Sequence, residues 1–420
     1  MKSLEEKPAE AARGRDVTHP APAIRRPPDQ APHPEEAPPP AGSAATAVKP
    51  FCPRAAPQSR ILSAGMVLGR VLSVVGALYC FLFSIALMSS AFTLLGAGFA
   101  AQALRTTSDP LAGLLIGFLA TSIVQSSSFT TALAVGLVAA GTLPLQLAIP
   151  IVMGANIGTT VTNTIVSLGH VRRQKEFERA FAAGTVHDFF NVLAAATLFP
   201  VELLFHPIER LATWLGESFA GLGGLQLASP LQAVIKPATH AVATLIPHPV
   251  VLLVLALATL FFSISVMVKL MRRMVIGRAE RLFGRVLFRN DLSGFFLGWG
   301  LTTVVQSSSV TTSLIVPLVG TGVLSVRRIF TYTLGANVGT TITAILASLA
   351  LGNPLAIMVA AAHLVFNIMG AAIFYPLRAL PIGMATWAGR VASRSRRSTV
   401  KVLAVYVLLH AIPILYIILA

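Results

Sequence analysis

The sequence predicts an all-α integral membrane protein with about seven spanning helices and two re-entrant helical hairpins. Three observations support this fold class. The 420 residues are 55% hydrophobic and 11% charged, whereas a soluble chain has about 25% charged residues. The apolar residues form runs long enough to cross a bilayer as helices. Two further apolar runs carry the same polar block at mid-length, which argues against an ordinary soluble enzyme and indicates a polar site inside the membrane.

The predicted spanning helices are uninterrupted apolar runs, since about 20 residues suffice for one crossing. They cover 70–97, 146–168, 181–203, 243–268, 327–350, 355–377 and 402–420. The runs 111–141 and 292–322 differ, because Gln-Ser-Ser-Ser followed by threonines stands near the middle of each. Polar residues at that depth are unfavourable unless they line a cavity or bind something. Each of these two runs is therefore expected to fold as a hairpin that enters and leaves on one side.

These two runs belong to an internal repeat. Residues 113–168 align with 294–349 without a gap, at a constant offset of 181, and 25 of 56 positions are identical. The identities concentrate in Gln, Ser, Thr, Asn and Gly, in the blocks QSSSFTT and QSSSVTT and in GANIGTTVT and GANVGTTIT. Chance similarity between apolar segments would match Leu, Val and Ala instead. The repeat indicates a duplication, and duplicated halves with polar interruptions are typical of secondary transporters.

The distribution of basic residues predicts the topology. The formal net charge is +16, and nearly all basic residues after position 60 lie between apolar runs, as the positive-inside rule expects. With a cytoplasmic N-terminus and two re-entrant hairpins, 20 basic residues lie inside and 3 outside; two full crossings would give 11 and 12. The rule favours hairpins that enter from opposite faces, so the fold is predicted to be an inverted-repeat transporter. The charge reflects topology, and no nucleic-acid partner is expected.

The chain divides into five predicted parts. The Pro-rich segment 1–60 holds 13 of the 27 prolines and has too little apolar surface to fold, so it is expected to be a disordered cytoplasmic tail. Segment 204–242 contains Pro and Gly residues that are expected to prevent long helices, and it is predicted to be an extracellular loop. The parts are the tail 1–60, a first repeat with its loop at 61–242, a second repeat at 243–380, a basic cytoplasmic segment at 381–401 and a C-terminal transmembrane helix at 402–420.

The hairpin tips are the candidate binding site. Each tip offers a side-chain amide and several hydroxyls, and a broken helix also exposes backbone N–H groups and carbonyls. Hydroxyls both donate and accept hydrogen bonds, so such a tip can hold an oxyanion beside a small hard cation. No Lys or Arg lies deep in a span, which favours sodium as the charge that offsets the anion. The predicted substrate-binding residues are Gln125, Ser126, Ser127, Ser128, Gln306, Ser307, Ser308 and Ser309.

Further oxygen ligands come from the second repeated block and from one carboxylate. The glycines of the block permit close helix approach or local unwinding. Asp188 is the only carboxylate in the middle part of a predicted span, and a cation or proton site is the favoured interpretation. His187 and His363 stand in matching places, where packing and function are equally good explanations. The predicted sodium-binding residues are Thr130, Thr131, Asn156, Thr159, Thr160, Asp188, Thr311, Thr312, Asn337, Thr340 and Thr341.

At these motifs the chain resembles the type II sodium/phosphate cotransporter family, which has paired QSSS hairpins. The resemblance rests on QSSSFTT, QSSSVTT, GANIGTTVT, GANVGTTIT and VHDFFN and covers roughly residues 65–380. It implies sodium-driven uptake of inorganic phosphate, with both tips forming the phosphate and sodium sites. In electrogenic members an Asp at the position that Asp188 matches contributes to an additional sodium site, so electrogenic transport is expected. The large extracellular loop of animal members is not matched, which points to a bacterial-type protein of the inner membrane.

Several alternatives stay open at this point. The repeat supports transport, but only the resemblance selects phosphate over sulfate, arsenate or a carboxylate. A membrane-embedded serine hydrolase would need a nucleophile with a base and an orienting group; the chain has no G-x-S-x-G, so neither enzyme activity nor a cofactor other than transported sodium is expected. A phosphate-sensing protein and a channel are weaker hypotheses. The sequence does not distinguish elevator from rocking motion or specify an oligomeric state.

Overall fold

The structure is a computed structural model that describes residues 58–107, 109–159, 161–221, 224–286 and 290–419. The predicted tail 1–60 lies almost entirely outside these residues, and so does Thr160 of the predicted sodium site. The described residues belong to one unit, Gln58–Ala420, and all of its regular elements among them are helices.

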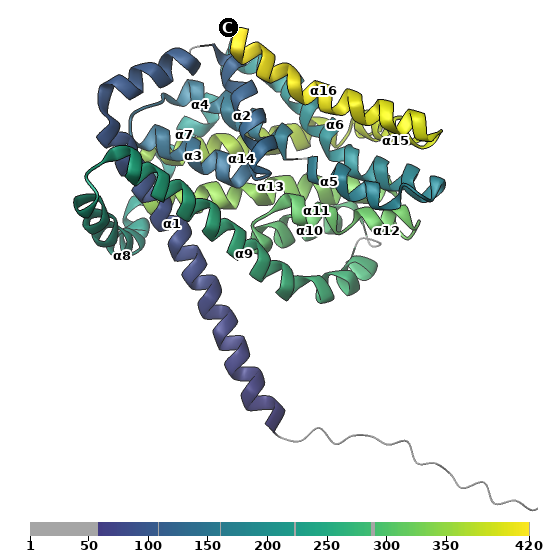
Figure 1. The fold of residues 1–420 in the computed structure, drawn as a ribbon, viewed down its shortest axis with the longest axis horizontal. Helices are drawn as coiled ribbons and strands as arrows, with labels where there is room; N and C mark the ends of the chain where they lie inside the picture. Colours follow the sequence, from purple (N-terminus) through teal and green to yellow (C-terminus); the bar gives the residue numbers. More distant parts are fainter. Residues whose placement is uncertain (1–57, 108, 160, 222–223, 287–289, 420) are drawn as a thin grey trace, which may run out of the picture. The chain divides into compact units, whose positions relative to one another are not determined.

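Seven helical segments of the described residues are long and apolar enough to cross a membrane, and each overlaps one of the predicted runs. The all-α membrane fold is thereby confirmed, and the chain is a multi-pass membrane protein. The segments lie in α1 (Gln58–Thr107), α4 (Leu145–Gly158) with α5 (Val161–Ser167) and the 3₁₀ turn η1 (Leu168–His170), α6 (Gln174–Phe205), α9 (Pro249–Val286), α13 (Val326–Leu351), α14 (Pro354–Phe374) and α16 (Arg396–Leu419) (Figure 1).

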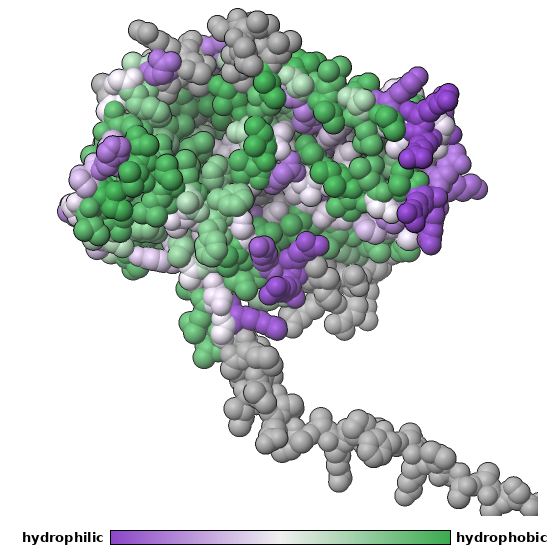
Figure 2. Space-filling model, viewed as in Figure 1, coloured by the Kyte–Doolittle hydropathy of each residue, from purple (hydrophilic) through white to green (hydrophobic). Residues whose placement is uncertain are grey.

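The surface of the described residues is largely apolar, as expected for a protein in contact with lipid tails. Figure 2 shows hydrophobic residues over most of the visible face, with hydrophilic residues gathered mainly toward one end. Large apolar side chains such as Leu204, Phe262 and Val407 are 72%, 67% and 66% exposed. Exposed apolar surface on this scale is unfavourable in water and favourable against lipid tails.

The two polar-interrupted runs each break into helices at the QSSS block. The first gives α2 (Pro110–Val124) and α3 (Ser127–Ala139), and the second gives α10 (Asp291–Val305), α11 (Ser308–Ser313) and α12 (Val316–Gly320). At both breaks the glutamine has left-handed backbone, with φ of 58° at Gln125 and 59° at Gln306. The following serine caps the next helix, so the matched sequences fold into matched corners.

Glycines bring the helices of each half into close contact. A Cβ at Gly154 would lie 1.8 Å from the carbonyl oxygen of Leu114, and one at Gly335 would lie 1.9 Å from that of Phe295. The predicted close approach therefore holds in both copies, with α2 against α4 and α10 against α13. The two copies differ in continuity, since α13 runs unbroken through its GANVGTT block whereas α4 ends at Gly158.

The bases of the two hairpins lie at opposite ends of α13. At the end of the first hairpin, the carbonyl of Ala139 accepts a hydrogen bond of 3.0 Å from Asn353, just beyond the C-terminus of α13. The second hairpin ends at α12, directly before α13 begins. Helix α13 has 26 residues and is about 39 Å long. The opposite orientation of the two halves across the membrane stays a prediction.

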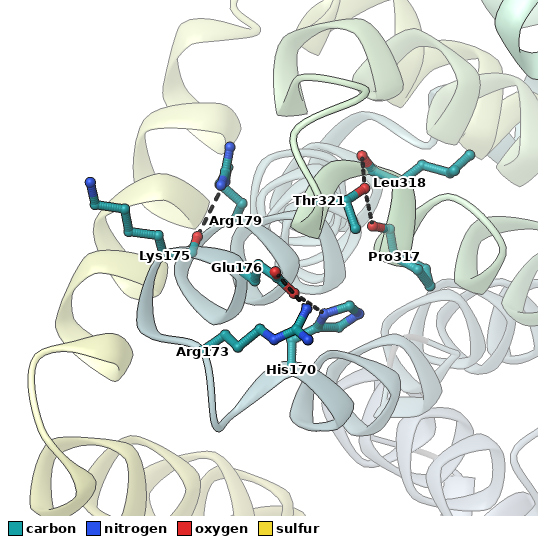
Figure 3. Close-up of polar contacts among 8 residues, drawn as sticks. All are labelled: His170, Arg173, Lys175, Glu176, Arg179, Pro317, Leu318 and Thr321. Carbon is teal, nitrogen blue, oxygen red and sulfur yellow. Dashed lines mark hydrogen bonds and ion pairs between the residues drawn. The ribbon is translucent and has the colours of Figure 1, made fainter.

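The base of the second hairpin lies beside a basic turn, which the positive-inside rule predicts to be cytoplasmic. Figure 3 shows Thr321, just after α12, next to Arg179 and Glu176 at the start of α6. A Cβ at Gly322 would meet the Arg179 guanidinium at 2.4 Å. The base of the first hairpin instead contacts the far end of α16, where Tyr416 donates a hydrogen bond to Asp109 and holds the pKa of that carboxyl below its usual value.

Segment 204–242 contains more helix than the sequence indicated. Helices α7 (Pro207–Gly221) and α8 (Gly224–Leu245) cover most of it, and α8 continues through Pro230 and Pro237. The expectation that Pro and Gly prevent long helices here was wrong, because α8 packs against α1 and tertiary contact outweighs the loss of two backbone donors. The basic segment 381–401 is also largely helical, in α15 (Ala379–Ser393) and the start of α16. The assignment of both segments to the two sides of the membrane stays a prediction.

Candidate substrate and ion site

Both hairpin tips line a single cavity. Its volume is about 330 Å³, and α9 completes its wall with Phe261, Ser265 and Lys269. All eight predicted substrate-binding residues line it: Gln125, Ser126, Ser127, Ser128, Gln306, Ser307, Ser308 and Ser309. Residues 181 positions apart in the sequence thus meet around one space that is large enough for a small oxyanion with ions.

Each tip is braced by the same two side-chain hydrogen bonds. The glutamine Oε1 accepts from a threonine of the second block, at 2.8 Å from Thr162 to Gln125 and 2.7 Å from Thr343 to Gln306. Below the tip, two threonine hydroxyls join the arms of the hairpin, at 2.8 Å for Thr121 with Thr130 and 2.7 Å for Thr302 with Thr311. The repeat therefore duplicates the bracing as well as the ligands, which favours a site whose two halves must be held in fixed shape.

The tips also contact the opposite half of the molecule. The hydroxyl of Ser128 donates to that of Thr343 at 3.4 Å, and the hydroxyl of Ser309 donates to the carbonyl of Thr159 at 3.0 Å. Ser128 and Ser309 are 5% and 6% exposed. Because these contacts cross between repeats, a movement of one half relative to the other changes the cavity directly.

Behind the tips lies a buried network that pairs the halves crosswise. His187 Nε2 lies 2.8 Å from Asn337 Oδ1, and His363 Nε2 lies 3.4 Å from Asn156 Oδ1. The amide of Asn337 donates both hydrogens, to Asn191 and Asn367, so its oxygen accepts from His187. His187 in this tautomer, together with the contact of His363 with Asn156, links the two repeats.

The ten predicted sodium-binding residues that the structure describes lie outside the lining of the tip cavity. The hydroxyls of Thr159, Thr340 and Thr341 donate to carbonyls of their own helices at 3.0, 3.1 and 2.7 Å. Their lone pairs are still available, so a sodium role for these residues stays a prediction.

Asp188 lines a different cavity. This second cavity has a volume of about 500 Å³ and largely apolar walls from α6, α15 and α16. Asp188 Oδ2 accepts a hydrogen bond of 3.2 Å from Thr164. Thr164 follows Asn163, which bonds to Thr312 beside the second tip. The carboxylate is therefore linked to the tips through α5 and does not share their cavity.

Several polar residues at the site were absent from the predicted set, among them Thr162, Ser265, Lys269 and Asn163. Asn163 was not predicted because the matching position is Ala344, and most predicted residues are present in both copies. Lys269 was counted only as a charge that reports topology, although it lines the tip cavity. Its signal was present in the sequence, since it is the first basic residue after the apolar run of α9.

The fold and this cavity define a class of protein, a multi-pass membrane protein with two pseudo-symmetric polar tips of the kind found in secondary transporters. Residues 80–229 and 259–386 match the family described as Na+/Pi-cotransporter. The chain belongs to that family, which is one of transporters and not of enzymes, and the predicted resemblance is confirmed. No solved structure matches the chain.

Named relatives agree with the family. The chain is 32% identical to human "Sodium-dependent phosphate transport protein 2B", over an alignment that covers 81% of this chain and 64% of that protein. It is 32% identical to rat "Sodium-dependent phosphate transport protein 2A", over 83% of this chain and 68% of that protein. The matched part thus spans about two thirds of these relatives.

Proposed function

We propose that this protein is a symporter that imports inorganic phosphate together with sodium. The observation that carries the proposal is the convergence of both QSSS tips on one cavity of about 330 Å³. Membership of the Na+/Pi-cotransporter family supports the choice of phosphate and sodium over other ions.

Phosphate binding follows from the donors that surround the cavity. Six serine hydroxyls can rotate to donate, and two of these serines also cap the helices α3 and α11. Lys269 adds the one positive side chain among the residues lining the cavity. An exposed ammonium attracts an anion without holding it tightly, because salt and water screen the interaction. A site of this kind binds phosphate reversibly, as transport requires.

Coupling to sodium is proposed because the negative charge of bound phosphate needs to be balanced. A dianionic or monoanionic phosphate between hydroxyls and a single lysine is incompletely neutralised, and bound sodium offsets the remainder. Each ligand then raises the affinity of the other by the same factor. The buried threonine oxygens around the tips are hard ligands of the type that alkali cations take.

The proposed mechanism is alternating access across the cell membrane. The tips are proposed to be re-entrant hairpins that meet near the midplane, and the N-terminus is proposed to be cytoplasmic. A bacterial inner membrane is the proposed location. Because the contacts of Ser128 and Ser309 cross between the repeats, displacement of one half opens the cavity to one side at a time.

Asp188 is proposed to make transport electrogenic. Its carboxylate supplies a negative charge within a membrane-spanning helix, which an additional sodium ion can neutralise. The hydrogen bond from Thr164 and the contact of Asn163 with Thr312 link this position to the second tip. A sodium ion at Asp188 would add net positive charge to each transport cycle.

The test is phosphate flux in proteoliposomes with sodium or choline outside. The proposal predicts uptake against a phosphate gradient in sodium and only leak in choline. In parallel samples, excess sulfate, arsenate or a dicarboxylate is added as a competitor of labelled phosphate uptake. Equal flux in both cations rejects coupling, and stronger competition by sulfate than by unlabelled phosphate selects another oxyanion as the substrate.

A further inference from the structure

The second tip is tethered by a side-chain pair that links the two repeats. Asn163 of α5 donates from Nδ2 to the hydroxyl oxygen of Thr312 in α11 at 2.9 Å, and Asn163 Oδ1 lies 3.1 Å from the same hydroxyl. Thr312 also donates to the carbonyl of Ser308 at 2.7 Å. Asn163 is 1% exposed and Thr312 is 3% exposed, so neither group exchanges these bonds for water.

A second tether reaches the same helix. The hydroxyl of Tyr332 donates to the carbonyl of Thr311 at 2.9 Å, and Tyr332 is fully buried. Helix α11 has six residues, and Pro317 follows at the start of α12. So short a helix is not stable by itself. The two tethers therefore help to hold this helix against its neighbours.

The first tip has neither tether. The positions that match Asn163 and Tyr332 are Ala344 and Ile151, which carry no polar side-chain atom. Thr131, the counterpart of Thr312, is 1% exposed, and its hydroxyl has no hydrogen-bond partner among the described residues. A buried hydroxyl without a partner is unfavourable. The first tip is thus less well satisfied in this conformation than the second.

We propose that Asn163 is a positioning residue that fixes the second tip, and that the untethered first tip is the one that rearranges when ligands bind. Asn163 is not among the residues lining the tip cavity, so it acts through Thr312. The identity of the ligands rests on the proposed function. The difference between the tips rests only on the contacts given above.

Matched reporters can test this difference. Phe129 and Val310 stand 181 positions apart, both line the cavity, and neither is a predicted ligand. Each is changed to cysteine in the full-length protein after Cys52→Ser and Cys80→Ser remove the two native cysteines. The rate of labelling by a charged methanethiosulfonate reagent is then measured, first in choline without phosphate and afterwards in sodium with phosphate.

In choline, Asn163→Ala should raise the labelling rate at position 310 by roughly tenfold, as expected for loss of a buried hydrogen-bonded pair. The labelling rate at position 129 should change less than about twofold, because that reporter lies on the other tip. Tyr332→Phe, which removes only one hydroxyl, should act in the same direction and serves if Asn163→Ala folds poorly. Ala344→Asn offers Thr131 a partner and should slow labelling at position 129. In the parent protein, sodium with phosphate should change the rate at 129 several-fold more than at 310.

Equal acceleration at both reporters by Asn163→Ala and Tyr332→Phe, or no acceleration at 310, would overturn the positioning role. A larger ligand-dependent change at 310 than at 129, or none at either, would overturn the assignment of the first tip as the part that rearranges. The choline measurements use no sodium and no phosphate. They therefore judge the tether even if the flux experiment rejects sodium-coupled phosphate transport.

Discussion

The two halves of the molecule agree where they surround the cavity and differ in what holds them there. The left-handed glutamines, the capping serines, the Gln–Thr bonds and the Thr–Thr bonds occur in both copies at nearly equal distances. The tethers of Asn163 and Tyr332 occur only at the second tip. The polar groups that surround the cavity are symmetric, whereas the contacts that support them differ between the halves.

This difference suggests that the two tips have different roles when the cavity opens and closes. In transporters built from internal repeats the substrate site lies where the two repeats meet, so both repeats can contribute ligands to it. Such a site does not need two equally mobile arms. A fixed arm and an adjusting arm can together open and close a cavity, and the described contacts assign these roles to the second and first tips.

The largest expected effect comes from two matched glycines, which test whether the helices pack equally closely in both halves. A Cβ at Gly117 would lie 1.9 Å from the Ile151 carbonyl, and one at Gly298 would lie 2.0 Å from that of Tyr332. Backbone must move in either case, so Gly117→Ala and Gly298→Ala should each destabilise the fold by about 3 kcal/mol, the upper end of what overpacking a core costs. Thermal unfolding of detergent-solubilised protein measures this. Gly300→Ala, where nothing lies within 4 Å, is the control and should unfold like the parent; equal behaviour of all three variants would contradict the close packing.

The next effect tests the symmetry of the ligands. Ser127→Ala and Ser308→Ala remove matched hydroxyls from the cavity lining, and each should lower sodium-dependent phosphate uptake by at least roughly tenfold, since a lost hydrogen bond to a charged group costs about 1.5–3 kcal/mol. Ser73→Ala, whose exposed hydroxyl bonds only to the Gly69 carbonyl, should leave uptake unchanged. If only one of the two variants lost phosphate uptake, the two tips would not both bind the substrate.

A smaller effect concerns Asp188, which has no counterpart in the second half. Asp188→Asn preserves size and removes the charge. Uptake should persist at reduced rate while the net charge moved per phosphate falls, because the extra sodium is no longer bound. Current and radiolabelled flux are recorded on the same proteoliposomes, with Glu217→Gln at an exposed position as the control. An unchanged ratio of charge to phosphate would remove Asp188 from the transport cycle.

The smallest effect concerns Lys269. Lys269→Gln should raise the phosphate concentration at half-maximal uptake by about threefold, the size expected of an exposed charge. The difference should shrink in added salt, because screening weakens the attraction. Lys269→Arg should retain parental behaviour. Arg273→Gln, on the same helix but outside the cavity lining, is the matched control, and an equal effect in that variant would show a general surface potential instead of a local role.

Much of this arrangement could be predicted from the sequence, because polar residues inside apolar runs leave a strong signal. The seven spans followed from length and hydropathy, and the cavity-lining set followed from the repeat of Gln125–Ser128 at Gln306–Ser309. Asn163 was not predicted, because the matching position in the second copy is Ala344 and the repeat therefore gives no signal there. The helix α8 was missed because local Pro and Gly preferences say nothing of its contact with α1. The separation of Asp188 from the tip cavity depends on helix packing, which no local pattern specifies.

The measurement that tests the central claim most directly is the stoichiometry of phosphate binding to the purified protein in saturating sodium. If both tips form one site, equilibrium dialysis should find one phosphate per chain. At a phosphate concentration that half-saturates the parent protein, Ser127→Ala and Ser308→Ala should each lower the bound phosphate by roughly fivefold or more, because each lost hydrogen bond weakens binding at least roughly tenfold. Two phosphates per chain, or the loss of only half of the binding in each variant, would show that each tip binds independently and would contradict a shared cavity.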